Sequence, residues 1–115
     1  MIVLDTTLRK LELVLAGAIT TNQLSFVATY QDSTLAPPAT VQGASNNTTA
    51  VTLVAAPASG VQRTLEYLAI YNADTVAATV TVRLNDNSTL RRIVNVSVPS
   101  GSTLNFVRDV GWSIA

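Results

Sequence analysis

The sequence predicts an all-β fold, either an antiparallel β-sandwich or a jelly-roll-like barrel, with about seven or eight short strands. Several segments alternate apolar and polar residues, which is the period of a half-buried strand. Turn-forming residues separate these segments at roughly 8–12-residue intervals, a spacing typical of antiparallel sandwiches. The chain has 115 residues, enough for one core, so residues 1–115 are predicted to form a single domain.

The amino-terminal third fits two templates. The leucines that share a helical spacing are Leu4, Leu8, Leu11 and Leu15. Leu11, Leu13 and Leu15 also alternate with other residues, as in a strand. We favour the strand, because Gly17 and the Thr-Thr-Asn run at residues 20–22 then lead to a second alternating segment at residues 24–30. A short helix over residues 6–13 is the alternative.

Residues 32–50 break every period. They contain two prolines, Gly43 and a run of Ser, Thr and Asn, a composition that predicts a loop or an extended arm. Loops of this length in compact domains commonly carry function, although a tip without any role is the alternative. Residues 1–9 form a second possible arm.

The remaining strands follow from composition and alternation. Residues 51–55 predict a short strand, and residues 64–71 predict a central strand because they are apolar on both sides apart from Glu66. Residues 75–84 and 90–98 predict a hairpin through the turn at residues 85–88, with a loop of three to five residues and both valine sets on one face. Residues 103–107 and 111–115 predict two short terminal strands.

The charge balance limits the partners of this chain. Seven basic and seven acidic residues leave a net charge of zero, and only 12% of the chain is charged. Such a chain has no long-range field to attract nucleic acid or anionic lipid, and it has little repulsion to oppose self-association. The longest apolar stretch, residues 13–19, is far shorter than the ~20 residues that span a bilayer. We therefore expect a soluble, unsecreted protein that binds neither nucleic acid nor membrane.

Catalytic, metal and cofactor sites are not predicted. The chain lacks His and Cys, the commonest general base and the usual zinc ligands. Its carboxylates are scattered and lie mostly at turns, and no phosphate-binding or nucleophile-elbow glycine motif is present. The N-D-N run around Asp86 lacks the glycine and glutamate of a calcium loop, so it predicts a turn. We expect a protein that is not an enzyme and uses no cofactor.

Two aromatic features and one basic pair are candidates for binding. Tyr67 and Tyr71 share one face of their predicted strand, where they would either cap the edge of the core or stack on sugar. Trp112 would either close the core or anchor a partner. Arg91 and Arg92 point to opposite faces of a strand, and one of them is expected to meet an acidic neighbour or cross a subunit boundary.

An ordered series of segments carries a family resemblance. The series runs KLELVLAGAITTNQL, FVATYQD, NNTTAVTLVAAPA, QRTLEYLAIYNADTVAATVTVRLNDN and a closing GW. It resembles small β-rich structural proteins of tailed bacteriophages, and within that group it is most similar to capsid decoration, or cement, proteins. The resemblance implies a homotrimer on the outer shell of the virion, made in the host cytoplasm, that ties neighbouring major capsid protein subunits together.

This resemblance and the composition lead to one functional hypothesis. Strand faces rich in Thr, Val and Ala would form the trimer, and the arms at residues 1–9 and 32–50 would clamp the shell. The candidate partner contacts are Ile2, Leu4, Leu35 and Trp112. The alternative is a phage tail, connector or fibre-associated module for assembly or host-surface carbohydrate binding, in which Tyr30, Tyr67 or Tyr71 stacks on sugar. A cytoplasmic sandwich with an enzyme activity is a third, disfavoured alternative.

Overall fold

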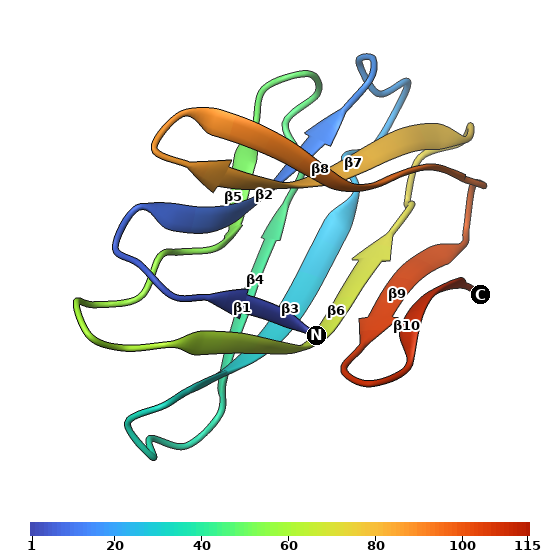
Figure 1. Cartoon of the computed structure of the whole chain (residues 1–115). Coiled ribbons are helices and arrows are strands. Elements are labelled where there is room, and N and C mark those ends of the chain that lie inside the picture. Colours follow the sequence, from blue (N-terminus) through green and yellow to red (C-terminus); the bar gives the residue numbers. More distant parts are fainter.

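The computed structural model describes residues 1–115 as ten strands in two antiparallel sheets that pack face to face (Figure 1). The predicted all-β sandwich is confirmed, although it has more strands than the seven or eight expected. The chain forms no helix long and apolar enough to cross a membrane.

Sheet A has a five-strand path with a short additional strand. The path runs β10 (Gly111–Ile114), β9 (Thr103–Val107), β6 (Arg63–Tyr71), β3 (Ser25–Asp32) and β4 (Ala39–Ala44). The additional strand, β1 (Ile2–Leu4), pairs with the first residues of β6, while β9 pairs with its last residues. The predicted central strand is therefore β6, which is paired along both of its edges.

Sheet B has four strands in the order β5 (Val51–Val54), β2 (Arg9–Leu15), β7 (Ala78–Asp86) and β8 (Thr89–Val98). Strand β2 resolves the ambiguity of the amino-terminal third. Leu11, Leu13 and Leu15 are buried and lie opposite Leu84, Val82 and Val80 of β7. The segment is a strand, and the helix over residues 6–13 does not form.

One apolar core fills the space between the sheets. Its seventeen buried residues are Leu4, Leu11, Leu13, Leu15, Leu24, Phe26, Ala28, Leu53, Val54, Leu65, Leu68, Ile70, Val80, Val82, Val98, Leu104 and Phe106. Strands β4 and β10 contribute none of these residues, β1 and β8 contribute only their last residue, and each of the other strands contributes at least one residue from the middle of its span. At about 1.5–3 kcal/mol for each large buried apolar side chain, this core supplies the main favourable contribution to folding.

The β7–β8 hairpin keeps its predicted face but not its predicted loop. Val80 and Val82 lie opposite Val96 and Val94, so both valine sets point inward. Asp86 pairs with Thr89, which leaves a two-residue turn whose residues both have positive φ, the geometry of a tight hairpin turn. The predicted loop of three to five residues is wrong. A register shift beside Val82 keeps both valine sets on the inward face despite the shorter turn. The same shift turns Leu90 to the other face, where it lies opposite Asn85.

The loop predicted over residues 32–50 is wrong for its middle part, because β4 forms there and pairs with β3. An edge strand buries few side chains, so β4 lacks the apolar alternation by which strands are recognised. At Gly43, β4 packs closely against the Phe26 ring, because a Cβ at this position would lie 2.8 Å from the ring. Only residues 33–38 remain as a connection between β3 and β4.

Residues 1–9 do not extend as an arm. β1 pairs with β6, and Leu4 is 1% exposed within the core of its own chain. The leucines whose spacing suggested a helix are divided between two strands, with Leu4 in β1 and Leu11 and Leu15 in β2. Any clamp on a partner must therefore come from another part of the surface while β1 stays paired.

Candidate functional site

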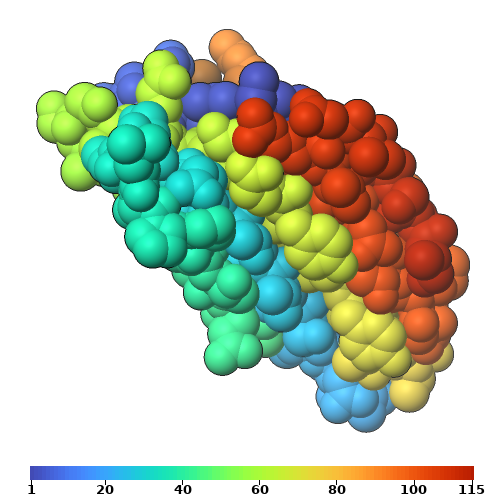
Figure 2. Space-filling view, turned by 90° about the horizontal axis from the view of Figure 1, so that it is seen from below, coloured from blue at the N-terminus to red at the C-terminus, as the bar shows by residue number.

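Fifteen neighbouring positions on the outer face of sheet A carry no charged side chain. The strand registers place these residues in three rows, which are Gln42, Val27, Ala69, Asn105 and Ser113; Thr40, Thr29, Tyr67, Val107 and Gly111; and Ala44, Ser25, Tyr71, Thr103 and Ala115. We call these fifteen positions the uncharged face. Figure 2 looks onto the side where β4, β3, β6, β9 and β10 lie next to one another.

A shallow hollow lies between two tyrosines on the uncharged face. Tyr67 and Tyr71 are 39% and 44% exposed and lie on either side of Ala69 along β6, about 13 Å apart at strand spacing. Residues of three neighbouring strands line the same hollow, among them Val27 and Asn105. The Tyr67 hydroxyl donates a hydrogen bond to Asn105 Oδ1 at 3.2 Å, which holds one ring in place beside the hollow.

Tyr30 does not join the other two tyrosines. Tyr30 alternates along β3 with the buried Phe26 and Ala28, so it faces inward and packs partly buried against the core. The Arg63 guanidinium lies 4.1 Å above its ring, a cation–π contact. The structure therefore brings Tyr67 and Tyr71 together and places Tyr30 on the opposite side of the sheet.

Ion pairs border the uncharged face but do not enter it. Arg63 binds Asp32 through two hydrogen bonds, Nε to Oδ1 at 2.8 Å and Nη2 to Oδ2 at 3.1 Å, which hold the pKa of Asp32 below its usual value. Arg108 reaches Glu66 at 2.8 Å. No three carboxylates gather closely enough to hold a metal ion.

The outer face of sheet B differs from sheet A because it buries a charge. Glu12 is 5% exposed, and its carboxylate accepts hydrogen bonds from Arg83 Nε at 3.0 Å and Asn85 Nδ2 at 3.1 Å. Lys10 Nζ lies 3.4 Å from the same group. Burial raises the pKa of Glu12, but these three donors outweigh it and lower the pKa below its usual value. Glu12 thus stabilises the pairing of β2 with β7.

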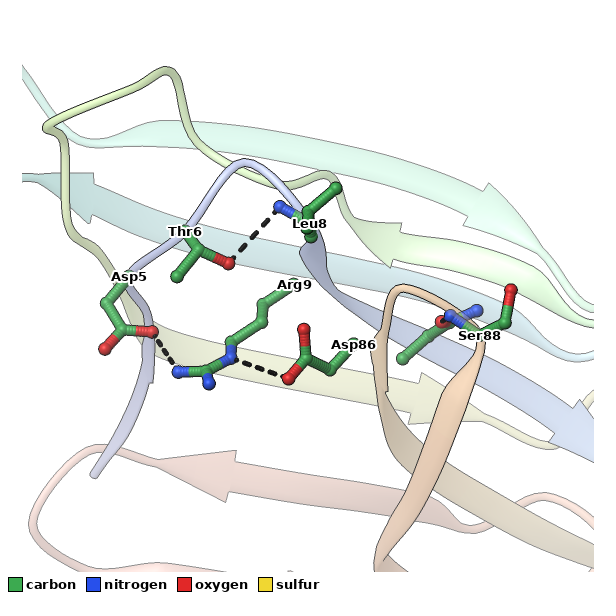
Figure 3. Close-up of polar contacts among 7 residues, drawn as sticks. Asp5, Thr6, Leu8, Arg9, Asp86 and Ser88 are labelled. Atoms are coloured by element: carbon green, nitrogen blue, oxygen red, sulfur yellow. Dashed lines mark hydrogen bonds and ion pairs between the residues drawn. The ribbon is translucent and has the colours of Figure 1, made fainter.

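The segment before β2 is tied to the β7–β8 hairpin (Figure 3). Arg9 lies between two carboxylates, with Nη1 2.7 Å from Asp5 and Nε 3.1 Å from Asp86. The Asn87 backbone N–H donates to the Leu8 carbonyl at 3.1 Å. These contacts, with the pairing of β1, hold residues 1–9 on their own chain.

A second buried carboxylate joins two loops at one end of the sandwich. Asp74 is 3% exposed and accepts hydrogen bonds from the backbone N–H groups of Thr20, Thr21, Asn22 and Thr75, at 2.7–3.2 Å. These hydrogen bonds, of which that from the Thr20 amide has the largest effect, lower the pKa of Asp74 to about 2. Burial opposes them by raising the pKa. This group orders the β2–β3 loop against the β6–β7 loop, which is a structural role.

The four predicted partner contacts lie in different environments. Leu35 is 95% exposed at the β3–β4 turn, with a positive φ of 64°. Trp112 is partly buried, its ring centroid 4.9 Å from that of Phe106. Ile2 packs partly buried against the core and Leu4 lies inside it. Leu35 is therefore free to contact a partner, Trp112 is free in part, and Leu4 is not.

The uncharged face was not predicted as a unit. The alternation of β6 placed Tyr67 and Tyr71 together, but the alignment of five strands depends on registers that no single segment encodes. One signal was present in the sequence: the face is built from residues 25–30, 39–44, 67–71, 103–107 and 111–115, and none of these segments contains Asp, Glu, Lys or Arg.

No protein-family model, curated protein or solved structure matches this chain.

Proposed function

We propose that this chain is a structural virion protein that decorates and stabilises a phage capsid, by forming a trimer and clamping neighbouring major capsid protein subunits. The observation that carries the proposal is the uncharged face. Its Thr, Val, Ala, Ser and Tyr side chains can be buried against another protein without desolvating a charge. The resemblance to cement proteins supports the choice of a viral shell as the partner.

The size of the uncharged face indicates how strongly it binds. Five strands about 4.8 Å apart and five residues about 3.4 Å apart give an area of about 400 Å². This is half of the ~800 Å² that each partner buries in a standard interface. The face alone supports weak association, and a repeating shell would add the remaining affinity through many simultaneous contacts. Binding only the assembled shell stabilises it by mass action.

The symmetry of the trimer adds a constraint. A threefold ring joins two different surfaces of each copy, whereas a face that packs on itself gives a twofold dimer. In the proposed trimer, the uncharged face of one copy contacts a different surface of the next copy. The oligomer number therefore distinguishes this arrangement from simple face-to-face pairing.

Replacing Ala69 with arginine tests the face directly. Ala69 lies at the centre of the uncharged face, with Val27 and Asn105 on either side of it. Ala69→Arg therefore places a charge that must be desolvated when the face is buried. Sedimentation equilibrium at protein concentrations up to about 1 mM is expected to show trimers of the unmodified chain. A Kd of this size corresponds to a binding free energy of about 4 kcal/mol. The variant is expected to associate at least ~10-fold more weakly.

Thr52→Arg is the matched control. Thr52 is exposed on β5, opposite Glu12 in sheet B, so this variant carries the same added charge on the other sheet. It is expected to associate like the unmodified chain. A monomer at every concentration would refute the trimer, and equal association of the two variants would refute the uncharged face as its interface.

The location on the shell needs a separate measurement. In purified particles, the labelled protein is expected to be present in many copies, as in a repeating shell. By electron microscopy, the label is expected to appear over the capsid surface. A tail component would instead be present in the few copies of a ring or fibre. Label confined to the tail would refute decoration of the capsid.

The hollow between the tyrosines favours a second candidate function, a tail, connector or fibre-associated module that binds host-surface carbohydrate. Exposed aromatic rings beside neutral hydrogen-bonding groups suit an uncharged sugar chain. If this function is correct, maltohexaose or cellohexaose is expected to shift the NMR signals of residues 67–71, and Tyr71→Ala is expected to weaken binding at least ~10-fold. Tyr30→Phe, on the other side of the sheet, is the control. No response to either sugar would remove this candidate.

A further inference from the structure

The outer strand of sheet B has a long free edge. β8 has ten residues and pairs only with β7. The other outer strands are shorter: β5 and β10 have four residues each and β4 has six. A free edge presents unpaired backbone N–H and C=O groups that can pair with another strand. Within β8, residues 94–98, which follow the register shift, contain neither charge nor proline, two of the features that block such pairing.

An apolar hollow opens beside this edge. Val94 and Val96 of β8 line it from sheet B, and Trp112 and Ile114 of β10 line it from sheet A. Ile114 is 43% exposed, and the other three pack only partly buried against the core. The two sheets thus leave room at this side of the sandwich for an additional apolar side chain.

Two unpaired cations lie at one end of the same strand. Five of the seven basic residues have a carboxylate within 4 Å, and the two that have none are Arg91 and Arg92. Both are exposed. Arg92 lies directly opposite Arg83 of β7, whose guanidinium is already paired with Glu12. Arg91 and Arg92 are thus left for an anion from outside the chain.

We propose that the free edge of β8 binds an extended acidic segment of a partner protein by strand addition. The segment pairs its backbone with residues 94–98, inserts an apolar side chain into the hollow beside Trp112, and pairs its carboxylates with Arg91 and Arg92. This inference rests on the proposed function and identifies the contact that would clamp the shell. The chain receives a segment of the shell protein instead of extending its own arms.

A protein segment suits this surface better than a nucleic acid. Nucleic acids bind to tracks of several cations, whereas here the two arginines adjoin an uncharged strand edge and an apolar hollow. The backbone groups of the edge match a peptide, and the hollow matches an apolar side chain. The charge of the two arginines selects acidic residues at one end of the segment.

Two synthetic peptides test the proposal, since the direction of the added strand is not fixed. Acetyl-Val-Thr-Val-Thr-Val-Asp-Glu-amide places its acids beside Arg91 and Arg92 in antiparallel pairing, and acetyl-Glu-Asp-Val-Thr-Val-Thr-Val-amide does so in parallel pairing. One of them is expected to slow hydrogen exchange of the amides in residues 94–98, leave those of β5 unchanged, and bind at least ~10-fold more tightly than its dilysine counterpart at low salt.

The charge-reversed double variant Arg91→Glu with Arg92→Glu is the decisive control. It is expected to lose at least ~10-fold in affinity for the acidic peptide and to gain affinity for the dilysine peptide, a reversal that misfolding cannot produce. Adding Ile114→Ser is expected to weaken binding of the acidic peptide to the otherwise unmodified chain and of the dilysine peptide to the charge-reversed variant. Urea unfolding of each variant confirms that it is folded.

Three results would overturn the inference: no protection in β8 with either peptide, equal affinity for acidic and basic peptides, or tighter binding of a ten-nucleotide oligothymidine at the same arginines. None of them depends on the uncharged face. Association of the unmodified chain and of Ala69→Arg is measured without peptide, so a failure of the clamp and a failure of the proposed trimer are distinguishable.

Discussion

Replacing Asn72 with aspartate is expected to lower the free energy of unfolding by about 3–5 kcal/mol at neutral pH, the range for an uncompensated buried charge. Asn72 is fully buried. Its Nδ2 donates hydrogen bonds to the carbonyls of Val76 and Val98, both at 2.9 Å, and its Oδ1 accepts from the Asp74 N–H at 2.9 Å. A carboxylate would turn a negative oxygen toward both carbonyls.

The pH dependence of Asn72→Asp identifies the cause. Burial and two facing carbonyl oxygens raise the pKa of a carboxyl group at this site above its unfolded value of about 3.9. The stability deficit is therefore smallest below that pH and grows as pH rises and the unfolded state loses its proton. Urea unfolding at pH 4 and pH 7 measures this difference.

Asn87→Asp is the control for the same substitution. Asn87 is exposed in the β7–β8 turn with a φ of 49°, a conformation that aspartate also tolerates. It is expected to change stability by less than ~0.5 kcal/mol. Equal stability of the two variants would show that the hydrogen bonds of Asn72 do not join the end of β8 to the β6–β7 loop.

Replacing Asp74 with asparagine is expected to remove an acid-sensitive part of the stability. The pKa of Asp74 is about 2, lowered from 3.8 by backbone amides led by that of Thr20. A carboxyl group with a lowered folded pKa contributes stability that is complete above the unfolded pKa and is lost as pH falls through the folded pKa. The difference between the unmodified chain and Asp74→Asn is thus expected to be largest at pH 7 and to shrink between about pH 4 and pH 2.

The geometry makes this substitution a test of charge. Asp74 Oδ1 accepts three of the four hydrogen bonds and Oδ2 accepts only that from Thr20, so an asparagine keeps three acceptor contacts. Asp109→Asn, whose side chain is 80% exposed, is the control and is expected to leave stability at pH 7 unchanged. A gap between the unmodified chain and Asp74→Asn that stays constant from pH 7 to pH 2 would contradict the assigned role.

Strands that bury one side were predictable from the sequence, because burial imposes a period of two. The alternation of Leu11, Leu13 and Leu15 predicted β2, and the two valine series predicted β7 and β8 on a common face. β4 and β1 were not predictable, because an edge strand of six residues and one of three bury too little to impose a period. The loop of the hairpin was misjudged because an extra residue in β8 changes the register.

The candidate surfaces divide in the same way. The shared face of Tyr67 and Tyr71 followed from their spacing within one strand. The hollow beside Trp112 required the positions of two strands from different sheets. The absence of a partner for Arg91 and Arg92 could be established only after every carboxylate had been placed.

The sequence by itself determined the all-β class, the inward faces of the long strands, and the shortage of charge that favours assembly, because these properties depend on composition and local periodicity. Only the tertiary structure decided which strands become neighbours, which charges find partners, and which edge stays open. These depend on contacts between residues far apart in the chain, as where Asp74 binds the loop around Thr20 and where β1, which carries Leu4, pairs with β6. Local patterns carry no information about such contacts, since each one is fixed by the packing of the whole sandwich.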